Sequence, residues 1–370
     1  MQVKKKTLLL LNQTNHFNMK IIHFTIVLSL FITIFTSCST DVDLYAEYKD
    51  VPIIYAMLNP KSDTNYVKIT RAFCGTNDNP INANEVALIA DSSNYPGKLG
   101  ARIIELKSTH GSYYEPTGRT MVLDTITLHN KETGVFYAPD QIFYYTTEPF
   151  NTGAGGTKYK YRLIVTKPDG DSLTALTGMV GNEEFIILTG GVSFKMAPTN
   201  NMGKIMFRAD GLASVYEISM QFNYWEQKNG QEKQKKNVKV SYGIRTINEF
   251  PKLEGSSNSY YLQYSENWLF NALSYAIGCD TVINSNHPEV VRYVDDFVIS
   301  ITAASDELAN YYVAHQMQAN SPMSLVTTYT NIEGGYGLFS SRTKIEKVAI
   351  LSANTKRELF GMYSWGFKEQ

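Results

Sequence analysis

The chain has 370 residues, of which 43% are hydrophobic and 19% charged, and its formal net charge is −1. This balance is that of a globular protein, and it excludes both the strongly basic surface of nucleic-acid-binding proteins and the charge excess of disordered chains. The length suggests about two domains of ~150 residues each. The 25 Tyr and 18 Phe favour half-buried, pleated surfaces, so we expect a mainly β protein.

A short apolar segment at residues 21–35 lies between Lys20 and Cys38. A positive charge, an apolar core, small residues and then a cysteine follow one another in this order in bacterial lipoprotein signals. A transmembrane helix is the alternative, but it needs roughly 20 apolar residues, and polar side chains interrupt this shorter core. We therefore predict a signal peptide over residues 1–37, removed immediately before Cys38.

The predicted lipid attachment site is Cys38, which places the mature chain on the outer membrane, on either the periplasmic or the exposed face. Residues 38–50 then form a polar, lipidated tether. Phe35 departs from the aliphatic residue that the usual lipoprotein motif carries at that position. Residues 1–18 make the segment before the apolar core unusually long, so Met19 is an alternative start.

Residues 51–181 are predicted to form an immunoglobulin-like β-sandwich, because short β-rich runs alternate with turn residues at near-regular spacing. Two hairpins are expected, one at 51–73 and one at 159–177, and the second surrounds the turn sequence Lys167-Pro-Asp-Gly170. Further predicted elements are strands at 101–106, 121–128 and 141–146 and a short helix at 82–91.

Residues 182–370 are predicted to form a second β-rich domain with helices near 265–278 and 305–317. Its clearest signal is the strict alternation of apolar and polar residues over 216–224 and 238–244. Asn229-Gly230 between these runs predicts an antiparallel hairpin. The side chains expected to face the core are Ile218, Met220, Phe222, Val238 and Val240.

No sequence motif for catalysis or metal binding is present, so we predict a non-enzymatic protein without catalytic residues, metal or cofactor. The glycine-rich segment 153–158 lacks the Gly-Lys-Ser/Thr of a phosphate-binding loop and precedes a predicted strand. The two cysteines besides Cys38, Cys74 and Cys279, are interpreted as buried small residues, with a disulfide as the alternative. The histidines of the mature chain stand far apart at positions 110, 129, 287 and 315.

The segment 327–339 carries the most distinctive pattern, with three glycines that predict a tight turn before a buried Phe339. It resembles the Asn-Ile-x-Gly-Gly-x-Gly-Ile-Phe signature of an outer-membrane lipoprotein family of Bacteroidota whose function is unknown. Residues 161–170 resemble a hairpin in the first half of that family, and the resemblance spans most of the mature chain. It implies an immunoglobulin-like domain joined to a second β-rich domain and genomic proximity to TonB-dependent receptors. It implies no site residue.

We therefore expect a lipid-anchored accessory or binding protein of the cell envelope that contacts the membrane through its anchor and has no nucleic-acid partner. The leading partner is an outer-membrane (TonB-dependent) receptor. The alternative is an adhesin lipoprotein that binds glycans or surfaces, for which the aromatic residues supply stacking platforms.

Overall fold

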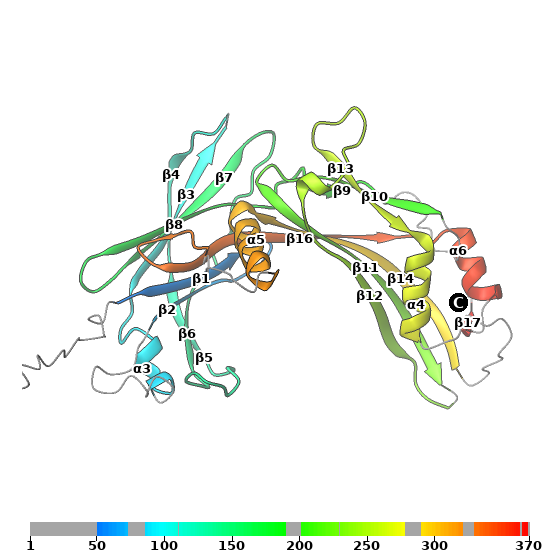
Figure 1. The fold of residues 1–370 in the computed structure, drawn as a ribbon, viewed down its shortest axis with the longest axis horizontal. Coiled ribbons are helices and arrows are strands. Elements are labelled where there is room, and N and C mark those ends of the chain that lie inside the picture. The colour runs from blue at the N-terminus through cyan, green and yellow to red at the C-terminus, as the bar shows by residue number, and fades with distance from the viewer. Residues whose placement is uncertain are drawn as a thin grey trace, which may run out of the picture. The chain divides into compact units, whose positions relative to one another are not determined.

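Three β-sheets account for most of the described chain (Figure 1). The computed structural model describes residues 50–72, 86–109, 111–189, 201–228, 230–277, 290–320, 329–362 and 365–368. The prediction of a mainly β fold is therefore confirmed.

The first half of the chain contributes strands β1 (Pro52–Leu58), β2 (Asn65–Arg71), β3 (Gly100–Ser108), β4 (Glu115–Val122), β5 (Asp124–Leu128), β6 (Gln141–Thr146), β7 (Lys158–Thr166) and β8 (Ser172–Gly178). The second half contributes β9 (Ile186–Ile187), β10 (Met202–Arg208), β11 (Ala213–Lys228), β12 (Gln234–Thr246), β13 (Ser259–Ser265), β14 (Val290–Ser305), β15 (Ile332–Glu333), β16 (Tyr336–Ala349) and β17 (Phe367–Lys368). The helices are α3 (Ala90–Ser93), α4 (Glu266–Ile277), α5 (Asp306–Asn320) and α6 (Ala353–Arg357), with single turns η2 (Ile247–Glu249) and η3 (Glu358–Met362).

The largest sheet runs β12-β11-β14-β16-β1-β2-β6-β5, and β17 pairs with β14 beside this path. A second sheet has the order β15-β8-β7-β3-β4, and a third has the order β13-β10-β9. Both predicted hairpins of the first half are present, because β1 pairs antiparallel with β2 and β7 with β8. The turn between β7 and β8 closes where Gly170 N–H donates to Lys167 O at 3.0 Å.

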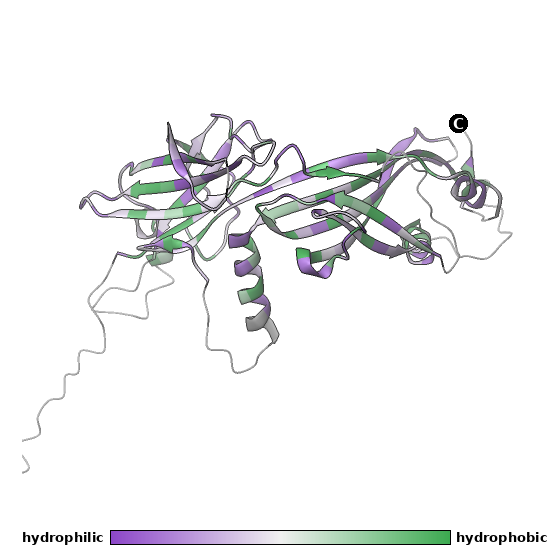
Figure 2. Cartoon of the chain, turned by 90° about the horizontal axis from the view of Figure 1, so that it is seen from above, coloured by the Kyte–Doolittle hydropathy of each residue, from purple (hydrophilic) through white to green (hydrophobic). Residues whose placement is uncertain are grey.

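The first core lies in a β-sandwich, between the inward side chains of β1, β2 and β6 and those of β3, β7 and β8. Along these strands buried side chains alternate with more exposed ones. Figure 2 shows bands of hydrophobic and hydrophilic residues along the strands of the chain. Leu58, Ile103 and Tyr161 are fully buried there. The sandwich predicted for residues 51–181 is therefore confirmed in its class.

The predicted strand at 121–128 is in fact two strands that belong to different sheets. β4 pairs with β3, whereas β5 pairs with β6 in the large sheet. Leu123 lies between them, is fully buried, and donates its backbone N–H to Ala101 O at 2.9 Å. The continuous β-rich run hid this change of sheet, because each half by itself fits a strand equally well.

The predicted hairpin of the second half is present as β11 and β12, which pair antiparallel with Met220 opposite Val240 and Phe222 opposite Val238. Ile218, Met220, Phe222 and Val240 are buried in the second core, and the half-buried Val238 packs against it. Gly230 has the positive φ of a turn residue, 75°, and Asn229 lies outside the described residues.

The two predicted helices are also present, as α4 and α5. Ser265 caps α4, because its Oγ accepts a hydrogen bond from Trp268 N–H at 3.2 Å. Leu269, Phe270 and Leu273 of this helix are buried in the second core. None of the helices in the described part of the chain is both long and apolar enough to cross a membrane.

One strand, β16, belongs to both halves of the molecule. Its residues 336–341 pair in parallel with β1, and its residues 342–349 pair antiparallel with β14. The two cores therefore share one continuous sheet, and residues 50–370 form a single compact unit.

The predicted domain boundary between residues 181 and 182 lies where the chain passes from the first core to the second. Residues 332–341 return to the first core, because β15 pairs with β8 and β16 with β1. Whether the two halves fold as separate domains stays a prediction.

The glycine-rich segment before β16 has a structural role. Asn331 donates its side-chain amide to Phe339 O at 2.7 Å and accepts Phe339 N–H at 2.9 Å, so it closes the turn that leads into the strand. Phe339 is fully buried, as predicted. Gly337 has φ +117°, and a Cβ at this position would lie 1.9 Å from Ile54 O of β1.

Replacing Gly337 with Ala is therefore expected to reduce the free energy of unfolding by about 3 kcal/mol or more, because backbone strain adds to a steric clash with β1. Urea unfolding followed by circular dichroism measures the change. The matched control is Gly118→Ala, since Gly118 also has a positive φ, +88°, but has no neighbour within 4 Å of the added Cβ. Equal losses for the two variants would show that the contact with Ile54 does not matter.

Candidate functional site

The predicted lipid attachment site, Cys38, lies outside the described residues, and so does the tether up to residue 49. Cys74, Cys279, His110 and His287 also lie outside them. Acylation of Cys38 therefore stays a prediction.

The two histidines that the structure describes are not arranged as metal ligands. His129 Nδ1 lies 2.6 Å from Asp140 Oδ1 in an exposed pair, and the His315 ring packs against Tyr311 with 4.2 Å between centroids. Among the described residues, no group of three or more His, Cys, Asp or Glu side chains is placed to hold a metal ion.

The glycine-rich segment at 153–158 forms a tight turn that leads directly into β7. Thr157 N–H donates to Ala154 O at 3.0 Å, and the following residue, Lys158, is the first of the strand. A phosphate-binding loop instead ends at the N-terminus of a helix, whose backbone N–H groups face the anion. The structure confirms that a strand follows this segment.

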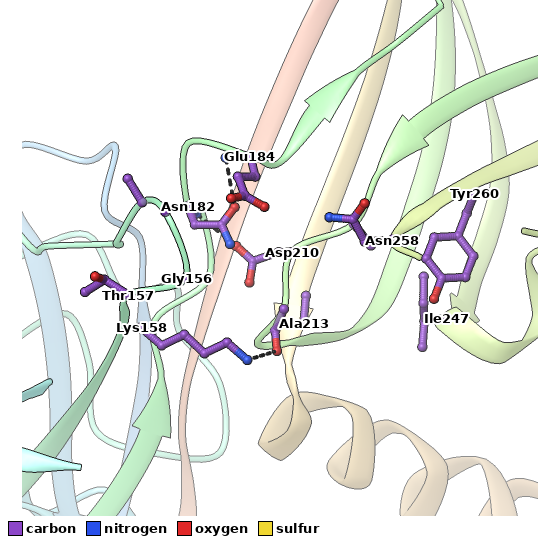
Figure 3. Close-up of a pocket in the computed structure, with 14 residues that line it drawn as sticks. Gly156, Thr157, Lys158, Asn182, Glu184, Asp210, Ala213, Ile247, Asn258 and Tyr260 are labelled. Atoms are coloured by element: carbon purple, nitrogen blue, oxygen red, sulfur yellow. Dashed lines mark hydrogen bonds between the residues drawn. The ribbon is translucent and has the colours of Figure 1, made fainter. Parts of the chain in front are cut away.

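Beside this turn lies a small pocket of about 260 Å³, shown in Figure 3. Its central carboxylate, Asp210, accepts hydrogen bonds from the backbone N–H groups of Gly181, Asn182 and Leu212 at 2.7–2.9 Å. Lys158 Nζ donates to Gly211 O at 3.5 Å. Backbone N–H groups of the chain therefore satisfy the hydrogen-bonding capacity of this buried carboxylate. Asp210 thus holds the chain where it passes between the two cores and has little capacity left to bind a ligand.

The strongest candidate for a binding site is the outer surface of the sheet formed by β1, β2, β6 and β5. Among the side chains that point away from the first core there, five make up what we call the aromatic face: Tyr55, Tyr66, Lys68, Phe143 and Tyr145. Tyr55 is 46% exposed and Tyr66 41% exposed, which is unusual for side chains of this size on a sheet. Adjacent exposed rings of this kind mark interaction surfaces.

The strand register brings these side chains together. Tyr55 lies opposite Lys68, and Tyr66 lies opposite Tyr145. The Tyr66 ring meets the Phe143 ring edge-on at 5.9 Å between centroids and the Tyr145 ring at 6.4 Å. Ile126 of β5 lies opposite Phe143 and extends the surface to the edge of the sheet.

Lys68 is the only charged member of the aromatic face. Its Nζ lies 5.3 Å from the centroid of the Phe143 ring and donates to Gln141 Oε1 at 3.0 Å. Burial lowers the pKa of the Lys68 ammonium, and the nearby positive charge of Lys131 lowers it further. Within the described part of the chain, no carboxylate forms an ion pair with either lysine.

The aromatic face therefore combines ring surface with one positive charge. Its rings offer apolar and polarisable area, and its ammonium attracts an anion. Sequence analysis missed this site, although the alternation Tyr66-x-Lys68 and Phe143-x-Tyr145 was available. The pattern did not show which of the two faces is exposed, or that β2 and β6 are neighbours.

Comparisons with known proteins do not assign the chain to a family. No protein-family model matches it, and no curated protein sequence matches it. Among solved structures, it is similar to the calcium-binding domain CBD12 of CALX1.1, at 8% identity over 81% of this chain and 99% of the other, with a TM-score of 0.16. A similar match is CBD12 of CALX1.2, at 6% identity over the same shares, also with a TM-score of 0.16.

We expect the purified protein to hold no stoichiometric zinc or calcium after dialysis, because the histidines and acids that the structure describes do not converge. Elemental analysis by mass spectrometry tests this. A content of about one metal ion per chain would contradict it and would direct attention to ligands outside the described residues.

Replacing Lys131 with Gln is expected to raise the pKa of Lys68, because a positive charge that disfavours its ammonium form is removed. The rise should be partial, since burial, the larger cause, remains. An NMR titration of labelled lysine Cε groups measures it, and Lys204→Gln in β10 serves as the control. An unchanged Lys68 titration in the Lys131 variant would show that the two ammonium groups do not interact.

Proposed function

We propose that this chain is a lipid-anchored binding protein of the cell envelope, held on the outer membrane through acylated Cys38 and acting without catalysis. The observation that supports a binding role is the aromatic face, where two exposed tyrosine rings and two half-buried aromatic rings lie beside two lysines that lack an acidic partner among the described residues. Such rings provide large contact area at low entropic cost, which is why tyrosine is enriched at binding surfaces.

The proposed anchor is sufficient in energetic terms. Each acyl methylene that enters the bilayer contributes ~0.8 kcal/mol, and one chain gives only marginal attachment. The cysteine of a lipoprotein carries more than one chain, so it holds the protein stably without a spanning helix. The polar residues 39–43 that follow Cys38 suit a segment that leaves the membrane surface.

For the partner, we propose an outer-membrane receptor of the TonB-dependent class, or a ligand that such a receptor imports. The support is the resemblance of segment 327–339 to the lipoprotein family whose genes often lie beside receptor genes. In the described structure, the glycines of this segment have a role in the strand junction.

The second candidate function is a glycan- or surface-binding adhesin, and the aromatic face is the observation that favours it. Exposed rings on a sheet serve as platforms on which flat apolar surfaces stack. The gene neighbourhood separates the two candidates, since a receptor gene beside this one supports the first and polysaccharide-degrading enzymes support the second.

Replacing Cys38 with Ala is expected to abolish acylation and lipoprotein-type cleavage, because the thiol is the proposed acceptor of the lipid. Mass spectrometry of the membrane-extracted protein, together with fractionation of the cells, measures both effects. The parent chain should begin at Cys38 and carry the mass of its lipid. A parent chain that starts beyond Cys38, or at Cys38 without lipid, would refute the anchor, and retention of residues 21–35 would support a membrane helix instead.

A further inference from the structure

The aromatic face has a regular geometry that limits what can bind to it. Neighbouring strands lie ~4.8 Å apart, and outward side chains repeat along a strand at every second residue, so these side chains form a regular lattice. Its central row consists of Tyr55, Lys68, Phe143 and Ile126, one from each of four adjacent strands. A ligand that fits has to be flat and extended.

Polar groups are interleaved with the rings of this lattice. The hydroxyls of Tyr66 and Tyr145 make no hydrogen bond with any described residue, so they are available to a ligand. The side-chain amide of Gln141 lies beside Lys68. It accepts a hydrogen bond from Lys68 and donates one to Asn130. The surface thus presents apolar ring area with donors and acceptors at its rim.

Among the five side chains of the aromatic face, the charge is the positive one of Lys68. Lys68 and Lys131 have no carboxylate partner within the described part of the chain, and burial and the positive charge of Lys131 both lower the pKa of Lys68. Of the acids near the face, Asp124 pairs with Lys98 at 3.1 Å, and Asp140 Oδ1 lies 2.6 Å from Nδ1 of His129. An anionic group bound at Lys68 would relieve the repulsion between the two lysines.

These features argue against a second copy of the chain as the occupant. A two-fold contact between identical faces would bring both pairs of lysines towards one another without an intervening acid. A sugar ring with a carboxylate fits better. One side of a pyranose is formed by C–H groups that stack on aromatic rings, its edge carries hydroxyls, and a uronic acid adds the negative charge.

We propose that the aromatic face binds an acidic polysaccharide built from uronic acids, with sugar rings stacked on Tyr66 and Tyr145 and a carboxylate at Lys68. The inference rests on the proposed role as an envelope binding protein and deepens it by naming the ligand class. Tyr55 and Phe143 extend the platform on either side of Lys68, so more than one sugar unit is in contact.

The test is isothermal titration calorimetry, in which the full-length, detergent-solubilised protein is titrated with polygalacturonate, with alginate, and with dextran as the neutral polymer. The parent chain is expected to bind at least one of the two acidic polymers saturably, to bind dextran not at all, and to lose affinity as salt is added. Tyr66→Ala and Lys68→Met should each weaken binding by about tenfold or more. Lys68→Arg should keep most of the affinity, since it keeps the charge.

Two matched controls separate the site from general effects. Lys204→Met removes another lysine that lies over a tyrosine ring, 4.4 Å from the Tyr261 centroid, and Tyr275→Ala removes a tyrosine of α4 that is 91% exposed. Both should bind within about twofold of the parent chain. Thermal unfolding of every variant confirms that it is folded before binding is compared.

Absence of saturable binding to both acidic polymers would overturn the inference, and so would affinities that the Tyr66 and Lys68 variants leave unchanged. The inference would also be overturned if poly-L-glutamate bound the parent chain as tightly as the acidic polysaccharides and if this binding depended on Lys68 but not on Tyr66. Such a result would indicate that the ligand is an acidic polypeptide. These outcomes are distinct from failure of the proposed function, because lipid on Cys38 is measured separately by mass spectrometry.

Discussion

The pairing of β16 with both β1 and β14 is the constraint on which the rest of the structure depends. A strand of fourteen residues is divided between a parallel partner in the first core and an antiparallel partner in the second, so one strand contributes to both cores. The approach to β1 is possible only because Gly337 has no Cβ that would meet Ile54 O. In the same sheet, β2 pairs with β1 and with β6, and these strands display the aromatic face.

Several buried polar groups resemble the residues of a functional site, but their contacts stabilise the fold. Burial and the neighbouring carboxylate of Glu105 raise the pKa of Tyr161, whose hydroxyl donates to Glu105 at 2.8 Å while Arg119 and Asn151 donate to the same carboxylate. In the second half, Glu226 is buried against Arg292, and the positive charges of Lys236 and Arg292 outweigh burial and lower the pKa of its carboxyl. Arg292 also donates to Trp365 O at 2.6 Å and so holds the C-terminal segment against β14. Buried groups of this kind are costly when unpaired, so networks around them are expected for structural reasons alone.

The aromatic face differs from these networks because its charge is not neutralised by described residues and its rings are exposed. A sheet surface usually places such rings inward, where burial stabilises the fold by roughly 1.5–3 kcal/mol for each large side chain. Tyr55 and Tyr66 forgo much of that contribution. Ile54 and Val67, their neighbours along the strands, are almost fully buried on the opposite side, so the exposed rings are not needed to fill the core.

The sequence by itself determined the β class, the hairpin of β11 and β12, the positions of α4 and α5, and the tight turn before Phe339, because these features depend on local periodicity, caps and turn residues. It also located the proposed lipid site at Cys38, and it contains no catalytic motif. Only the tertiary structure decided that residues 121–128 divide between two sheets, that β16 serves both cores, and that Tyr66, Lys68 and Phe143 lie together. The physical reason is that strand pairing is non-local. An alternating pattern indicates that one face of a strand is buried. It does not indicate which strands are neighbours or which face is exposed, because both follow from contacts between residues that are distant in the chain.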